Sequence, residues 1–108
     1  MSEYVKEING EEFSSAVANE TPTLIDFWAP WCGPCRMAAP LLERMAQQFS
    51  GRLRVRKLNV DEAPGVSQEY GVQGIPTMML FREGEKVDQV VGLLPEEALR
   101  NWLEKRLV

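Results

Sequence analysis

The chain has 108 residues, of which 44% are hydrophobic and 26% charged, and its formal net charge is −4. These values predict one globular α/β domain spanning residues 1–108, with its own core and no room for a second domain. The charge disfavours nucleic-acid binding, which calls for a basic excess, and no apolar run approaches the ~20 residues of a membrane span.

The N-terminal part of the chain predicts a strand, a helix and a second strand. Weak alternation indicates a short edge strand over Tyr4–Ile8. Asn9 can cap the helix that follows, and Glu12 can complete a capping box. The face of this helix that we expect to be buried holds Phe13, Ala16 and Val17. The run Thr23–Ala29 is too apolar to be half exposed, which predicts a central strand covered on both faces.

A longer helix is predicted to begin near Pro34 and to end at Ser50-Gly51. Its apolar residues recur at helical spacing: Ala38, Leu41, Leu42, Met45 and Phe49. Pro40 lies inside this pattern, so we expect a kink there and not an end. The segment Leu53–Val60 then predicts a second inner strand. The methionines Met37, Met45, Met78 and Met79 are interpreted as core filler.

The C-terminal part predicts a short helix over Asp61–Tyr70, with Pro64 in its first turn, and then a hairpin made of Thr77–Arg82 and Lys86–Val91. Pro95 begins a last helix, whose apolar stripe holds Leu99, Trp102, Leu103 and Leu107. Crossover helices require the first three strands to be parallel, whereas the hairpin is antiparallel. We therefore expect a mixed five-stranded sheet of three parallel strands plus an antiparallel hairpin, flanked by four helices.

The two cysteines, Cys32 and Cys35, lie between the predicted central strand and the helix that begins near Pro34. A helix N-terminus presents unpaired N–H groups and the positive end of the helix dipole, and both stabilise a thiolate. Gly33 permits a tight turn between the sulfurs, and Pro34 suits the first helical position because it has no N–H. A disulfide that closes so small a loop contributes little as a structural staple. We interpret the pair as a reversible dithiol–disulfide couple.

The two sulfurs are expected to behave differently. Cys32 precedes the helix and is predicted to be the accessible nucleophile, whereas Cys35, one turn into the helix, is predicted to be the shielded resolving thiol. Neither Gly33 nor Pro34 offers a charge or a side-chain donor to stabilise the thiolate further. The absence of such a group favours a reductant over an oxidase.

A metal site is disfavoured because structural zinc takes four Cys or His ligands, and this chain has two cysteines and no histidine. We therefore predict no metal. The lack of histidine also excludes Ser-His and Cys-His catalysis.

Asp26 lies within the apolar run and shares a strand face with Leu24 and Trp28. Because burial of a carboxylate is costly and raises its pKa, a buried Asp26 suggests a function. It could accept the proton of Cys35, directly or through water. The alternatives are a position at the frayed end of the strand or a structural pairing with Lys57.

The segment from Asp26 to Cys35 resembles the thioredoxin family. The likeness continues at Arg36-Met37, Ala39-Pro40, Lys57, Gly74-Ile75-Pro76-Thr77, Phe81 with Gly84, and Gly92. The resemblance implies the same fold and the activity of a protein-disulfide reductase without a bound cofactor. It also implies that a flavoprotein thioredoxin reductase supplies electrons from NADPH, and that protein disulfides accept them.

The resemblance further implies roles for residues outside the cysteine motif. It favours proton transfer by Asp26 with Lys57 as its neighbour, and it predicts a cis bond before Pro76, which would leave the Ile75 backbone free to pair with a substrate strand. The expected substrate platform comprises Trp31, Gly33, Pro34, Ile75, Pro76 and Gly92. Relatives often have a small residue after Gly92, so Leu93 is expected to alter the width of the groove. Trp28 would support the motif from below, with Pro40 as a second structural residue.

The first residues, 1–7, lack the basic and apolar regions of a secretory signal, which predicts a cytoplasmic protein, here expected to be a monomer. Two rival functions remain open at this point. One is a disulfide oxidase or isomerase on the same fold, and the other is a binding module whose thiols are incidental.

Overall fold

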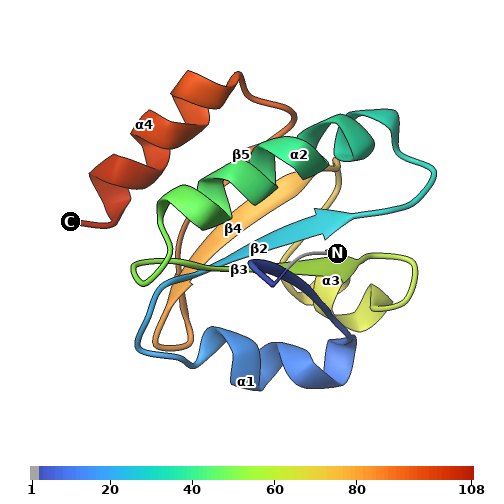
Figure 1. Ribbon diagram of the computed structural model, residues 1–108. Helices are drawn as coiled ribbons and strands as arrows, with labels where there is room; N and C mark the ends of the chain where they lie inside the picture. The colour runs from blue at the N-terminus through green and yellow to red at the C-terminus, as the bar shows by residue number, and fades with distance from the viewer. Residues whose placement is uncertain (1–2) are drawn as a thin grey trace.

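The structure is a computed structural model that describes residues 3–108 (Figure 1). Residues 1 and 2 of the predicted domain lie outside the described part. The elements are β1 (Val5–Ile8), a 3-10 turn (Gly10–Glu12), α1 (Phe13–Val17), β2 (Thr23–Trp28), α2 (Gly33–Gln48), β3 (Arg54–Asn59), α3 (Pro64–Glu69), β4 (Thr77–Arg82), β5 (Glu85–Val91) and α4 (Glu96–Arg106).

The five strands form one sheet in the order β1-β3-β2-β4-β5. β3 is parallel to both β1 and β2, whereas β4 is antiparallel to both β2 and β5. The predicted mixed sheet is therefore confirmed, with β1 at one edge and β2 at the centre.

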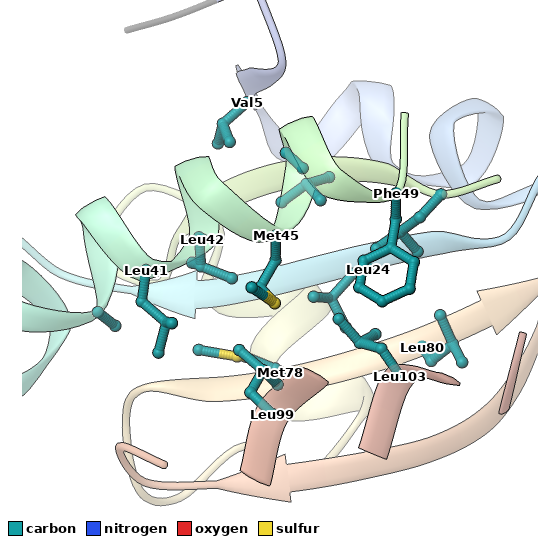
Figure 2. Close-up of a cluster of buried hydrophobic side chains, with 14 residues drawn as sticks. Val5, Leu24, Leu41, Leu42, Met45, Phe49, Met78, Leu80, Leu99 and Leu103 are labelled. Carbon is teal, nitrogen blue, oxygen red and sulfur yellow. The ribbon is translucent and has the colours of Figure 1, made fainter. Parts of the chain in front are cut away.

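Helices cover both faces of the sheet (Figure 1). α2 and α4 pack on one face around Leu24, Leu42, Met45, Met78 and Leu99, as Figure 2 shows. The other face carries a second cluster, to which α1 contributes Phe13 and Val17, β2 contributes Ile25 and Phe27, and α3 contributes the partly buried Val66. Successive residues of β2 thus enter opposite cores, which confirms a central strand covered on both sides.

The N-terminal helical segment is fixed by the capping box that the sequence predicts. The Glu12 N–H donates to Asn9 Oδ1, and the Asn9 N–H donates to Glu12 Oε1, each at 2.9 Å. The first turn is a 3-10 turn, after which Phe13–Val17 continues as α-helix. The bond to Glu12 Oε1 satisfies the Asn9 N–H, which has no partner within the helix, and the bond to Asn9 Oδ1 gives a second acceptor to the Glu12 N–H, which also donates to the Asn9 carbonyl at 3.2 Å.

Asn9→Ala is expected to lower the free energy of unfolding by about 1 kcal/mol, because the side-chain acceptor of the cap is lost. Urea unfolding measures this change. The control is Asn101→Ala, the same substitution at an exposed position inside α4, which should leave stability unchanged or slightly higher because alanine favours helix. Equal losses in the two variants would contradict the capping role.

Two helix boundaries differ from or refine the prediction. The helix expected over 61–70 begins only at Pro64 and ends at Glu69. Asn59 explains the late start, because its side chain accepts from the Asp61 N–H at 3.0 Å and its carbonyl from the Glu62 N–H at 3.0 Å, which holds this segment in a turn. α2 continues past Pro40, so the proline does not end it; the kink stays a prediction.

Candidate redox site

The cysteines occupy the junction between the end of β2 and the start of α2. Cys32 is the N-cap residue of α2, and Cys35 lies in its first turn. The two form a disulfide with a Cα–Cα distance of 5.3 Å. The Cys35 N–H donates to Cys32 Sγ at 3.2 Å. Because that N–H belongs to the positive end of the helix, it favours negative charge on the first sulfur in the reduced state.

Both sulfurs are set in an apolar pocket. Cys32, Cys35 and Ala29 form a buried cluster, against which Trp28, Val60 and Ile75 pack. Cys32 is 5% exposed and Cys35 is 2% exposed in the disulfide. Both residues are therefore buried in the disulfide, and the greater accessibility of Cys32 stays a prediction for the reduced state. Trp28 lies beside the motif as the sequence predicts.

A loop distant in sequence closes over the first sulfur. The Ile75–Pro76 bond is cis, as predicted, and Cys32 Sγ lies 3.8 Å from the Ile75 carbonyl oxygen. The Gly92 N–H donates to the Pro76 carbonyl at 2.8 Å, which joins this loop to the end of β5. Gly92 has φ +93°, a conformation that favours glycine. Within residues 3–108 the Ile75 N–H donates no hydrogen bond, so it is available to a strand laid beside it.

Exposed apolar side chains flank this site. Trp31 is 66% exposed and Leu93 is 39% exposed. The Trp31 Nε1–H donates to Asp61 Oδ2 at 2.8 Å, which fixes the ring over the loop that follows β3. Gly33 is partly exposed and Pro34 exposed, so the motif itself is open on this side. These exposures are consistent with the predicted substrate platform.

Met37 corrects one sequence interpretation. We expected it in the core, but its side chain is 66% exposed. The core face of α2 holds Ala38, Leu41, Leu42, Met45 and Ala46, and Met37 falls outside that stripe. The 3.6-residue periodicity could have excluded it, because hydrophobic character alone does not place a helical residue. Met45, Met78 and Met79 are buried as predicted.

Asp26 lies within β2 and is fully buried, with 0% exposure. Neither of its carboxylate oxygens has a hydrogen-bond partner among residues 3–108. Burial raises the pKa of Asp26 to about 7, and the positive charge of Lys57 lowers it in part. The frayed-end alternative is therefore wrong, because Asp26 pairs in register with Lys57 on β3 and with Met78 on β4.

Lys57 is the neighbour of Asp26 but forms no ion pair with it. Its Nζ lies 4.1 Å from the centre of the Trp28 ring, on the aromatic face. Within the described residues, no oxygen of the Asp26 carboxylate lies within 4.0 Å of Lys57 Nζ. Lys57 therefore acts on Asp26 through its electric field, while Trp28 holds the ammonium group by a cation–π interaction.

The sequence did not single out Asp61, although its bond to Trp31 fixes a ring of the platform. Asp61 follows the end of β3 by two residues, and Trp31 follows the end of β2. Because the carboxyl ends of parallel strands lie at one edge of a sheet, this spacing could have indicated that the two side chains are close. Pro40, expected as structural support, is exposed within α2.

Within residues 3–108 no three His, Cys, Asp or Glu side chains come together in a way that could hold a metal ion. None of the helices formed by these residues combines the length and apolar character that a membrane crossing requires.

Comparison with known proteins gives consistent matches. The thioredoxin family model matches residues 4–105. Thioredoxin 1 of Nostoc sp. is 53% identical over 89 residues, which cover 82% of this chain and 83% of the relative. Thioredoxin 1 of Synechococcus elongatus is 54% identical over 86 residues, 80% of each chain. The chloroplastic M-type thioredoxin of Spinacia oleracea is 42% identical over 110 residues, covering 98% of this chain and 61% of the relative.

Proposed function

This chain belongs to the thioredoxin family and is a thiol-disulfide oxidoreductase, a disulfide reductase with a Cys32–Cys35 redox pair, and on that premise we propose the role of each site residue. The observation that carries the proposal is the placement of Cys32 Sγ at the N-cap of α2, where it accepts the Cys35 N–H. This contact distinguishes the two sulfurs.

In the proposed reaction, the Cys32 thiolate attacks one sulfur of a substrate disulfide, and the other substrate sulfur leaves as a thiolate. The product is a mixed disulfide between Cys32 and the substrate. Cys35 then loses its proton and attacks Cys32 Sγ, which expels the second substrate thiolate and forms the Cys32–Cys35 disulfide. Two electrons pass from the dithiol to the substrate, which leaves as a dithiol.

Asp26 is the proposed acceptor of the Cys35 proton, directly or through water. A general base works best when its pKa lies near the operating pH, and burial places that of Asp26 at about 7. Lys57 is proposed to tune this base, since its charge opposes the effect of burial on the pKa. Gly33 and Pro34 are proposed to set the reducing poise because they add no donor to the thiolate. Trp28 and Pro40 are assigned supporting roles.

The proposed substrate groove is the part of the substrate platform formed by Trp31, Ile75, Pro76, Gly92 and Leu93. A substrate strand would pair with the free Ile75 N–H beside Cys32, while the exposed apolar side chains contact its flanking residues. Backbone pairing of this kind requires an accessible substrate strand beside the disulfide. The side chains at the rim of the groove then set the preference among substrate proteins.

Leu93→Ala is expected to shift the ratio of kcat/KM between a compact and a bulky disulfide substrate by about 10-fold in favour of the bulky one, because the rim becomes wider. Steady-state kinetics with the two substrates measures this ratio. Val87→Ala, an exposed valine at the opposite end of β5 from Gly92, is the control and should leave the ratio unchanged. If the kcat/KM ratio of Leu93→Ala equals that of the wild type, Leu93 does not belong to the substrate groove.

Thioredoxins act with a reductase and with substrate proteins. For this chain we propose that a flavoprotein thioredoxin reductase supplies electrons from NADPH, that no cofactor is bound, and that protein disulfides are the acceptors. We also propose a cytoplasmic monomer folded as one domain. The single sheet containing all five strands supports the domain proposal.

The test is a coupled assay with NADPH, a flavoprotein thioredoxin reductase and a protein disulfide. NADPH consumption is expected to depend on this chain and to disappear when Cys32 and Cys35 are both replaced by serine. A double variant that retains full effect on the substrate protein would instead support a binding module with incidental thiols. Efficient oxidation of protein dithiols with negligible reduction of disulfides would support an oxidase.

A further inference from the structure

Three cationic side chains gather on the sheet face that α1 covers, away from the cysteines. Lys6 of β1 lies directly opposite Arg56 of β3 in the parallel register. Arg54 lies two residues before Arg56, so it projects from the same face of β3. We refer to Lys6, Arg54 and Arg56 as the cation cluster. It lines a groove of about 280 Å³ between β1, α1 and β3.

The charges of the cation cluster are not neutralised within the described chain. None of the three side chains forms an ion pair within residues 3–108. Arg54 Nη1 donates to the Ala16 carbonyl at 3.3 Å, and Arg56 Nη1 donates to the Val55 carbonyl at 2.9 Å. Each guanidinium has five N–H donors, so most of them are left for another acceptor.

Two acidic residues also line the groove, Glu7 and Glu12, and their carboxylates offset only part of the three positive charges. Glu12 Oε1 accepts the Asn9 N–H in the capping box. Glu7 lies opposite Lys57 in the β1–β3 register, one position beyond the Lys6–Arg56 pair, so strand alternation directs it to the other face. The groove therefore keeps a local excess of positive charge in a chain whose net charge is −4.

This arrangement is unfavourable without a counterion. Like charges directly opposite each other on neighbouring strands destabilise a sheet. Partial burial, and then the charge of Arg54, lower the pKa of the Arg56 guanidinium below its usual value. An anion seated in the groove would offset both the repulsion and the loss of hydration.

We propose that the cation cluster binds a small, multiply charged oxyanion of the phosphate type. Two neighbouring guanidinium groups suit the paired oxygens of such an anion, and the Lys6 ammonium adds a point charge. The groove is lined by no aromatic ring on which a base could stack, which favours the oxyanion itself over a nucleotide. The site is separate from the redox pair, because Asn59 and not Arg54 or Arg56 pairs with Trp28 beside the cysteines.

Inorganic pyrophosphate is the probe, added to the full chain at low ionic strength and compared with sodium chloride of equal ionic strength. Binding by calorimetry and the shift in unfolding temperature are the readouts. Pyrophosphate is expected to raise the unfolding temperature of the wild-type chain more than sodium chloride does. Arg56→Gln should weaken its binding by at least about 10-fold, since a charge-assisted bidentate partner is lost.

Arg52→Gln is the matched control, because Arg52 is exposed and lies over the Phe49 ring at 5.3 Å, outside the groove. It should bind pyrophosphate like the wild type. Arg54→Gln provides a second test if Arg56→Gln does not fold. Equal effects of pyrophosphate on wild-type and cluster variants, or effects matched by sodium chloride, would overturn the proposal. ATP binding tighter than pyrophosphate by tenfold or more would overturn the preference for a small oxyanion. Disulfide reduction should be unchanged in all three variants, which separates this result from the proposed function.

Discussion

Replacing Cys35 by serine should convert turnover into the accumulation of a stable mixed disulfide between Cys32 and the substrate. The serine hydroxyl cannot attack the disulfide sulfur, so the reaction stops after its first step. Catalytic reduction is expected to fall to the background rate, while the first substrate thiol is still released. Non-reducing electrophoresis and mass spectrometry of the adduct measure this outcome and identify the linked cysteine.

Cys32→Ser is the matched control, since it makes the same atomic change on the other sulfur of the pair. It should form no comparable adduct, because Cys35 Sγ does not receive the hydrogen bond that Cys32 Sγ accepts at the helix start. Adducts formed through Cys35 at a similar rate would show that either sulfur can begin the reaction.

Asp26→Ala should raise the free energy of unfolding by about 3 kcal/mol at pH 7. The pKa of Asp26 is about 7 in the folded state and 3.8 for an ordinary aspartate. At 1.36 kcal/mol per pKa unit, this difference lowers the free energy of unfolding by roughly 4 kcal/mol when the group is fully ionised. The native state binds this proton more tightly than the unfolded chain does. The penalty is therefore absent below pH 4, grows between pH 4 and 7, and levels off above pH 7. Loss of side-chain packing in the alanine variant reduces the gain.

Urea unfolding at pH 4, 7 and 8.5 tests the sign and the pH window of the Asp26 effect. The increase in the free energy of unfolding caused by Asp26→Ala should grow from pH 4 to pH 7 and change little above pH 7. Glu62→Ala, which removes an exposed carboxylate, should stay within about 0.5 kcal/mol of the wild type at each pH. A variant less stable than the wild type at pH 7 and 8.5 would show that Asp26 is not an unpaired buried acid.

The same Asp26→Ala variant should release mixed disulfides more slowly, because Cys35 loses its proposed proton acceptor. In the wild type the rate of this second step is expected to rise with pH as Asp26 ionises near pH 7. In the variant that rise should be lost. Single-turnover measurements across this range separate a kinetic role from the change in stability.

The layout of the sheet could be predicted because the chain has clear local patterns. The apolar run Thr23–Ala29 marks β2 as an inner strand, and the crossover helices make the first three strands parallel. The burial of Asp26 followed from its position inside such a run. These inferences depend on periodicity and on the cost of burying charge, both of which are visible in the sequence.

Other features depend on contacts between distant segments. The attachment of Lys57 to the Trp28 ring, and not to Asp26, is a choice between two nearby partners that strand register leaves open. The late start of α3 comes from the side chain of Asn59, which competes with the helix for the next N–H groups. The position of Lys6 opposite Arg56 depends on the register between β1 and β3, which local sequence patterns leave open.

Competition alkylation of the reduced chain tests the central claim most directly. Substoichiometric iodoacetamide is added at a series of pH values, and peptide mapping by mass spectrometry reports the extent of modification at each cysteine. Cys32 should react first and should gain reactivity at a lower pH, because its sulfur accepts the Cys35 N–H at the helix N-terminus. Modification of Cys35 before Cys32, or ionisation of Cys35 at the lower pH, would contradict the proposed order of thiol attack.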